Sequence, residues 1–165
     1  MKSKHIILFE GLSLGEHEFD FEVDKSLFDK TKIKEILDTK IDVKVYLKKS
    51  ENMMNLDILF KGEFVIPCDR CNEEMKILVD DEGKLVVKYG QVENEDLDDL
   101  IILKDNEHEI DLSGYFYESL SLMIPQRNVH DESECDQEVI NMLKNTQIHL
   151  NDKSSDPRWE KLKNL

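Results

Sequence analysis

The chain of 165 residues is poor in cysteine, glycine and proline, and it contains no long apolar run. Three cysteines are an odd number, which argues against a closed disulfide framework and for reduced thiols. No run approaches the length of a membrane span, and the short apolar run at 6–9 is followed by Glu10 rather than a signal-peptide cleavage site. Six glycines supply no phosphate-binding loop, and no Ser-His-Asp pattern stands out. We therefore expect a cytoplasmic protein without an obvious catalytic motif.

Basic residues are also scarce, because 22 Lys and Arg stand against 37 Asp and Glu, which gives a net charge of −15. A field of this sign repels the phosphates of free nucleic acid, whose binding normally rests on clustered Lys and Arg. The lysines at 25–40 and the basic residues at 153–163 alternate with acids, which is typical of solvated surface. The charge favours a basic protein partner over RNA.

Apolar residues recur at every second position over most of the region 41–89, which is the pattern of strands with one buried face. The pattern predicts four consecutive strands, at 41–47, 53–68, 75–79 and 85–89, with turns at 50–52 and 80–83. Short strands are also expected at 6–9 and 19–23, and 100–103 could add another. Strands joined by such short connections predict an antiparallel meander.

One convincing helix follows, beginning at Asp111, whose side chain can cap free amides, and ending at Pro125. Its apolar residues share one face, so we expect the helix to cover the buried face of the meander. A short amphipathic helix is indicated around Val139, Ile140 and Leu143.

The predicted architecture is a single α+β domain spanning 1–165. Residues 1–90 are mainly β, 91–109 form an acidic connection, 110–125 form the helix, and 126–165 form a loop and a partly ordered tail. In the N-terminal part, Asp24 is expected to cap a helical turn.

The most informative stretch is Cys68-Asp69-Arg70-Cys71, which follows the longest predicted strand directly after Pro67. Because Pro67 marks the end of ladder pairing and strand alternation resumes at Met75, both thiols are expected at a turn between neighbouring strands. Two cysteines at this spacing form the commonest half of a structural zinc site.

These residues resemble the central signature of the YceD family, the large ribosomal RNA subunit accumulation proteins. Further similarities follow in the same order along the chain. They are Ile110-Asp111-Leu112, Glu118, Ile124-Pro125, the VHDESEC segment at 129–135, and Asp156-Pro157-Arg158-Trp159 with Leu162. The resemblance runs from about residue 60 to the C-terminus, whereas the first 40 residues carry little signature.

The resemblance implies a role in accumulation of 23S ribosomal RNA, and so in assembly of the large ribosomal subunit. It implies a partner that is ribosomal protein bL32, whose gene often neighbours those of bacterial members, or an assembly intermediate. No enzymatic activity is attached to the family, which leads us to expect a non-enzymatic binding protein.

A possible zinc site combines Cys68 and Cys71 with His130 and Cys135, because zinc takes four such ligands in a tetrahedron. The alternatives are structural thiols that are buried or free, and a redox pair at Cys68 and Cys71. Redox dithiols usually lie at a helix N-terminus, whereas this pair is expected at the end of a strand. The other histidines, including His5, are isolated in sequence and are expected on the surface.

Arg70, held between two cysteines, could present a fixed cation to phosphate or to an acidic partner, together with Arg127. A salt bridge from Arg70 to Glu73 or Glu74 is the alternative.

Overall fold

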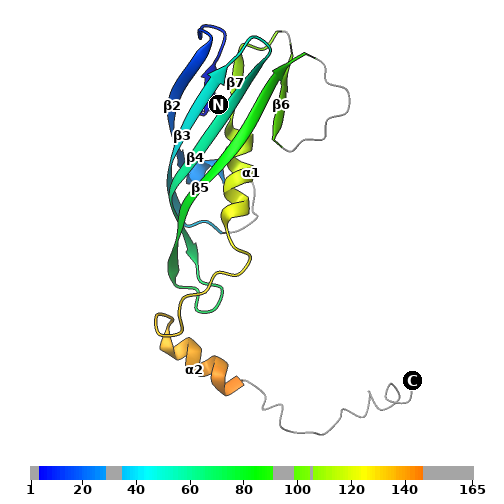
Figure 1. Ribbon diagram of the computed structural model, residues 1–165. Coiled ribbons are helices and arrows are strands. Elements are labelled where there is room, and N and C mark those ends of the chain that lie inside the picture. The colour runs from blue at the N-terminus through cyan, green and yellow to red at the C-terminus, as the bar shows by residue number, and fades with distance from the viewer. Residues whose placement is uncertain (1–3, 29–34, 91–98, 105, 147–165) are drawn as a thin grey trace, which may run out of the picture.

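The computed structural model describes residues 4–28, 35–90, 99–104 and 106–146, and its main element is a curved five-stranded sheet (Figure 1). The strand order is β2-β3-β4-β5-β6. The strands are β2 (Gly15–Asp24), β3 (Asp38–Lys49), β4 (Met53–Pro67), β5 (Glu74–Tyr89) and β6 (Leu100–Leu103). A separate pair joins β1 (Ile6–Leu8) to β7 (Glu109–Asp111). The first four strands of the sheet are antiparallel, and β6 runs parallel to β5. The predicted α+β class is confirmed.

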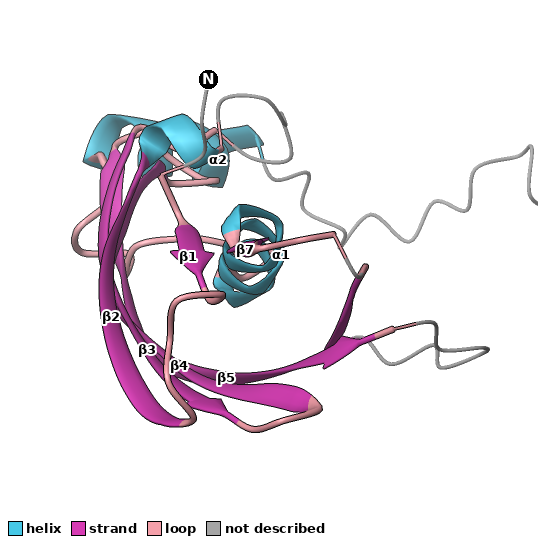
Figure 2. Cartoon of the chain, turned by 90° about the horizontal axis from the view of Figure 1, so that it is seen from above, coloured by secondary structure: helices cyan, strands magenta, loops and turns pink. Residues whose placement is uncertain are grey.

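The alternation of apolar residues places one face of every long strand in the core. In the central pair, Val43 lies opposite Phe60 and Val45 lies opposite Ile58, and all four side chains are almost fully buried. Figure 2 shows the sheet curving around helix α1 (Ser113–Met123), with β1 and β7 on the same inner side. The core therefore lies between the concave face of the sheet and α1.

Helix α1 forms where the sequence predicted it. The Asp111 side chain accepts a hydrogen bond of 2.9 Å from the amide of Ser113, and the helix ends at Met123, two residues before Pro125. Phe116 is fully buried, and its ring meets that of Phe60 edge-on with centroids 5.7 Å apart. The expectation that this helix covers the apolar face of the sheet is confirmed.

The predicted turn at 80–83 is wrong, because β5 continues through it as one strand paired with β4 along its whole length. Asp80 lies opposite Lys61, and Gly83 lies opposite Ile58. A Cβ at Gly83 would collide with the Tyr115 hydroxyl of α1. The glycine therefore makes room for the helix instead of turning the chain.

The two shorter predicted helices are confirmed, whereas parts of the predicted connection and tail lie outside the residues that the structure describes. The Asp24 side chain accepts a 2.9 Å hydrogen bond from the Ser26 amide and caps the short 3-10 helix η1 (Lys25–Leu27), as expected. The second predicted helix is present as α2 (Gln137–Thr146). Residues 91–98 and 105 of the acidic connection and 147–165 at the end of the C-terminal tail lie outside the described residues. Among the helices described, none is long and apolar enough to cross a membrane.

Candidate metal centre

The loop between β4 and β5 places two thiols on one side of the chain. Pairing ends where Pro67 lies opposite Glu74, and six residues, 68–73, make the reversal. Within it the amide of Asn72 donates to the carbonyl of Cys68 at 2.9 Å, and Asn72 has φ of 64°, a left-handed conformation that asparagine tolerates. This tight turn leaves Cys68 2% and Cys71 8% exposed, so both thiols point inward.

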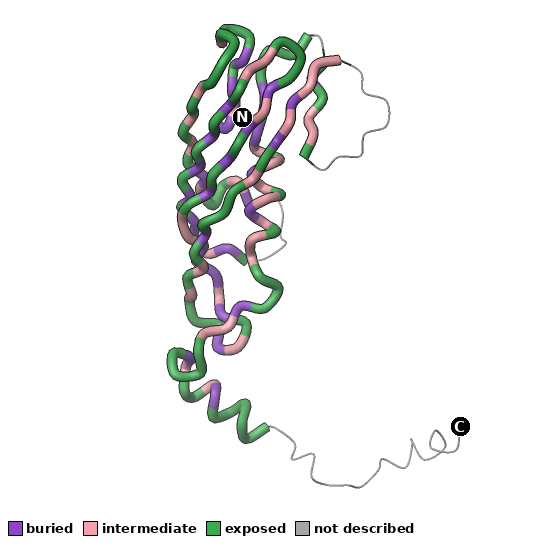
Figure 3. Tube along the Cα trace, in the orientation of Figure 1, coloured by how far each residue is buried: buried purple, intermediate pink, exposed green. Residues whose placement is uncertain are grey.

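The chain beyond α1 returns to this loop and is fastened to it by a reciprocal pair of hydrogen bonds. The amide of Asp69 donates to the carbonyl of Asn128 at 2.7 Å, and the amide of Asn128 donates to the Asp69 carboxylate at 2.7 Å. The buried Asn128 side chain also donates to the carbonyl of Pro125 at 3.0 Å. Figure 3 shows a group of buried residues at this junction, below the main core. The junction brings His130 and Cys135 to the loop.

Four potential ligand atoms converge there, from Cys68, Cys71, His130 and Cys135, all within 4.8 Å of one another. The sulfur atoms of Cys68 and Cys135 are 3.9 Å apart, and His130 Nδ1 lies 3.4 Å from the Cys71 sulfur and 3.8 Å from that of Cys135. A tetrahedral zinc ion with Zn–S of about 2.3 Å and Zn–N of about 2.0 Å separates two sulfurs by about 3.8 Å and a sulfur and nitrogen by about 3.5 Å. The donor set and its spacing therefore fit a metal such as zinc.

His130 presents the ring nitrogen that a metal requires. Its Nε2 atom lies 3.1 Å from the backbone carbonyl of Glu74. Because a carbonyl oxygen only accepts hydrogen bonds, Nε2 carries the proton, and the lone pair of Nδ1 faces the three sulfurs. Metal-bound histidines are commonly oriented by this kind of hydrogen bond from the other ring nitrogen.

Arg70 closes one side of the cluster. Its Nε donates to the Cys135 sulfur at 3.2 Å, and a terminal nitrogen donates to the carbonyl of His130 at 2.5 Å. Within the described residues, these contacts replace the predicted salt bridge to Glu73 or Glu74. The guanidinium therefore offsets negative charge on the sulfur atoms and holds the 130–135 segment to the loop.

Hydrogen bonding shifts the ionisation of the cluster. Burial alone would raise the pKa of the Cys68 thiol, but backbone amides of Cys71, His130 and Arg70 outweigh it and lower the pKa to about 6. Burial also opposes ionisation of Cys71, yet backbone and His130 hydrogen bonds lower its pKa, whereas burial raises the pKa of Cys135. The hydrogen bond to Cys71 raises the pKa of His130. These hydrogen bonds therefore favour the thiolate, the form of cysteine that binds metals, at Cys68 and Cys71, whereas Cys135 keeps its proton more firmly.

Helix α2 is attached to the same cluster. Ile140 is 4% exposed and belongs to a small second core together with the three cysteines. Asp136 accepts from the amide of Glu138 at 2.8 Å in the first turn, and the Gln137 side chain donates to the carbonyl of Cys135 at 3.0 Å. This small core shares no buried residue with the large one between the sheet and α1, and the partly buried Met75 packs against both.

The structure brings together all four residues predicted as possible zinc ligands. The cysteine pair lies between two strands, after β4 and before β5, as the sequence predicted. Arg70 is engaged inside the cluster and Arg127 is exposed beside it, and contact of either with a partner or RNA stays a prediction.

Sequence reasoning missed the Asp69–Asn128 pair, for which only the proximity of Asp69 to the cysteines was a signal. It was also wrong about His5, which is 7% exposed and packs edge-on against Phe116 with ring centroids 5.4 Å apart.

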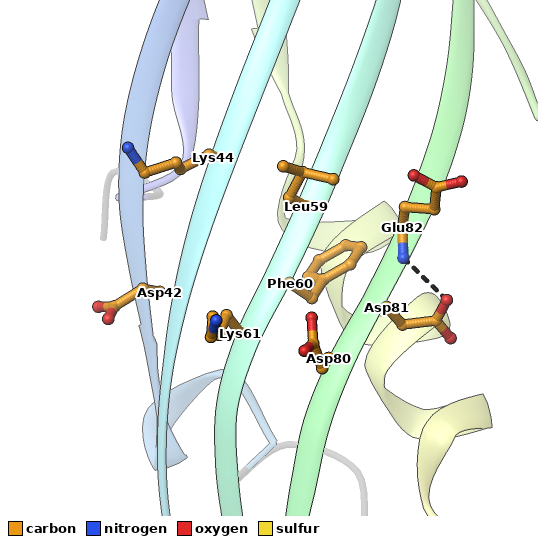
Figure 4. Close-up of a pocket in the computed structure, with 8 residues that line it drawn as sticks. All are labelled: Asp42, Lys44, Leu59, Phe60, Lys61, Asp80, Asp81 and Glu82. Atoms are coloured by element: carbon orange, nitrogen blue, oxygen red, sulfur yellow. Dashed lines mark hydrogen bonds between the residues drawn. The ribbon is translucent and has the colours of Figure 1, made fainter.

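Two depressions on the described surface lie away from the cysteine cluster. One of about 530 Å³ is centred on Leu59, Phe60 and Lys61 in the middle of β4 (Figure 4), about 25 Å along the strand from Cys68 at 3.3 Å per residue. Another of about 520 Å³ includes Tyr46 and Asp57. Neither includes a residue of the cysteine cluster.

Comparison with known proteins gives one match, and it covers this whole site. A search of curated proteins and a search of solved structures both returned no match. The family model described as large ribosomal RNA subunit accumulation protein YceD matches residues 56–165, which include most of β4, the cysteine loop, α1 and the segment carrying His130 and Cys135. Since this match spans more than half of the chain and includes all four candidate ligands, the protein belongs to the YceD family.

Proposed function

We propose that this protein is a non-enzymatic assembly factor that supports accumulation of 23S ribosomal RNA, and so of the large ribosomal subunit, by binding. The observation that carries the proposal is the family match over residues 56–165, the part of the chain in which the whole candidate metal centre lies. The family description names the accumulation of large-subunit ribosomal RNA.

The four-residue cluster holds zinc in a structural role. Three thiolates and one imidazole fill the four positions of a tetrahedral ion, whereas catalytic zinc usually keeps one position for water or substrate. The bound ion supplies charge neutralisation for the clustered thiolates. The chain's own part is to hold Cys68 and Cys71 at the loop and to bring His130 and Cys135 from beyond α1.

Binding without catalysis is supported by the surroundings of the thiols. Cys68, Cys71 and Cys135 are all buried, and the Arg70 guanidinium covers one side of the cluster. An exchange reaction requires a thiolate that a substrate can approach, and typical redox pairs begin a helix. Here the pair joins two strands, which favours a tie between chain segments.

The partner is a basic ribosomal protein, for which bL32 is the first candidate, or an assembly intermediate of the large subunit. The net charge of −15 favours such a partner by long-range attraction. Attraction between exposed charges is screened by salt, so the association rate and affinity should fall steeply as ionic strength rises.

The test of function is the ratio of 23S to 16S ribosomal RNA in cells that lack the protein, together with the large-subunit peak on sucrose gradients. We expect both to fall and to be restored by the wild-type gene but poorly by Cys68→Ser. An unchanged 23S level after deletion would overturn the proposal.

The test of the metal is elemental analysis of protein purified without chelators. We expect one zinc per chain, and three titratable thiols after its release. Protein that is metal-free and fails to take up zinc would refute the site. A Cys71→Ser variant that keeps the wild-type fold but loses a thiol redox activity of the wild type would favour the redox alternative.

A further inference from the structure

Helix α2 carries an apolar stripe that continues outward from the cysteine cluster. Ile140 is buried against the cluster, and Val139 is partly buried beside it. Met142 and Leu143, three and four positions after Val139, project from the same side of the helix and are 66% and 43% exposed. These three residues, Val139, Met142 and Leu143, are called the α2 stripe below.

Within the described part of the chain, nothing packs over the exposed portion of the α2 stripe. Figure 1 shows α2 beyond the end of the sheet, past the β4–β5 loop and away from α1. The first half of α2 is attached to the rest of the protein at Gln137 and Ile140. In its second half, Lys144 pairs with Glu132. An exposed apolar face on a helix anchored in this way is suited to a partner.

The charges around the stripe indicate what kind of partner fits. Residues 68–74 and 127–146 contain eight acidic and three basic residues. The acids are Asp69, Glu73, Glu74, Asp131, Glu132, Glu134, Asp136 and Glu138. Of the basic residues, Arg70 is engaged with Cys135, and Lys144 is paired with Glu132, which leaves Arg127. The loop and the segment that ends in α2 therefore carry five more acidic than basic residues, a marked excess of negative charge.

The outer face of the sheet is the competing surface, and its charges are largely matched internally. Lys44 pairs with Glu18 and Asp20 of the neighbouring strand at 3.6 Å each. Three further cross-strand pairs are Lys48–Glu16, Lys76–Glu63 and Lys84–Asp57. Lysines and carboxylates also mix around the depression of Figure 4. This face has less unmatched charge with which to attract a partner.

We propose that the α2 stripe and the acidic surface around it dock a Lys- and Arg-rich segment of a partner protein that also carries apolar side chains. Apolar side chains of that segment cover Met142 and Leu143, and its cations meet the surrounding carboxylates. RNA is a poorer occupant, because its phosphates meet the same carboxylates. The proposal rests on the proposed function, since it gives the basic partner a place on the chain.

The first test uses a synthetic helical peptide of leucine and lysine, with an all-lysine peptide of equal charge as the comparison, titrated against the full chain by fluorescence anisotropy. We expect the leucine-containing peptide to bind more tightly. Met142→Gln with Leu143→Gln should weaken it about tenfold or more, equivalent to about 1.4 kcal/mol. Leu122→Gln, which changes an 87% exposed leucine on α1, should leave it unchanged. Equal weakening by both changes, or no preference between the peptides, overturns the proposal.

A charge variant keeps the test independent of helix packing. Glu138→Gln leaves the stripe intact, and it should weaken peptide binding at low salt but not at high salt. Salt-independent binding, or binding insensitive to this change, counts against the proposal.

The occupant is identified by a photo-crosslinking amino acid placed at position 142 of the full chain, with position 122 as the control. Crosslinks to the peptide from position 142 alone support the proposal. Crosslinks from 142 to residues 147–165 of the same chain, to a second copy, or to an RNA oligonucleotide in place of the peptide overturn it.

Measurements in cells separate this proposal from the proposed function. If deletion lowers 23S RNA but the Met142→Gln, Leu143→Gln variant restores it fully, the docking surface is wrong and the proposed function stands. If deletion leaves 23S RNA unchanged, the proposed function fails, while the peptide and crosslinking results still decide the surface.

Discussion

Replacing Cys135 with serine should detach the segment beyond α1 while leaving the body of the protein folded. Cys135 is the only one of the three thiols that lies outside the β4–β5 loop, and it is 4% exposed. Its sulfur lies 3.9 Å from that of Cys68 and accepts the Arg70 hydrogen bond. Serine keeps the approximate volume but removes the thiolate.

The size of the effect follows from the ligand count. Structural zinc contributes about 10–16 kcal/mol in zinc-finger peptides, or about 2.5–4 kcal/mol for each of four ligands. The loss of one ligand should therefore weaken zinc binding by about 10²–10³-fold. The large core between sheet and α1 shares none of its buried residues with the small core at the cluster. The free energy of unfolding of the sheet and α1 should therefore change little.

The assay combines a zinc competition titration with amide hydrogen exchange of the full chain. We expect amides of residues 128–146 to exchange faster in Cys135→Ser, while those of β4 between Met54 and Phe64 keep their protection. Glu134→Gln, an exposed neighbouring change, is the control and should match the wild type. The reasoning is refuted if Cys135→Ser binds zinc as tightly as the wild type, or if β4 loses protection together with α2.

Three further changes test the body of the protein. Phe116→Ala removes a fully buried ring and should cost about 3–5 kcal/mol of unfolding free energy in urea titrations; a cost below 1 kcal/mol would contradict its central position. Gly62→Ala places a Cβ against the backbone carbonyl of Lys40 and should cost about 1–3 kcal/mol; an unchanged midpoint would contradict this close approach. Hydrogen bonds from Ser26 lower the pKa of Asp24 to about 2, so its stabilisation is present above about pH 4 and is lost as pH falls toward 2. Because Asp24 is partly exposed, Asp24→Asn should cost at most about 1 kcal/mol at pH 6 and much less at pH 2, measured as the difference from wild type.

Local patterns predicted much of this fold because their physical causes are local. Apolar residues at every second position identified the strands around Val43 and Ile58. A capping aspartate and a later proline marked the two ends of α1. The misread stretch was Asp80–Gly83, where three acids and a glycine have the composition of a turn. The reason for Gly83 is Tyr115, a residue 32 positions later, and no local pattern contains that contact.

The candidate site shows the same division. The spacing of Cys68 and Cys71 predicted a shared turn, and the need for four ligands pointed to His130 and Cys135. The role of Arg70 depends on a segment that returns 60 residues later, where His130 offers its carbonyl. The sequence suggested Glu73 or Glu74 as the partner of Arg70, because both are close to it along the chain. It gave no information about which distant backbone carbonyl comes close in the fold.

The separation of the two cores has a consequence for a cell in which zinc becomes scarce. The sheet and α1 contain their own buried side chains, so if the cluster holds zinc as proposed, loss of the ion would leave a compact, folded body and not an unfolded chain. That body would keep its core covered, yet it would no longer hold helix α2 in position. The supply of zinc could thus set the fraction of protein molecules that hold α2 in place, without changing the total amount of the protein.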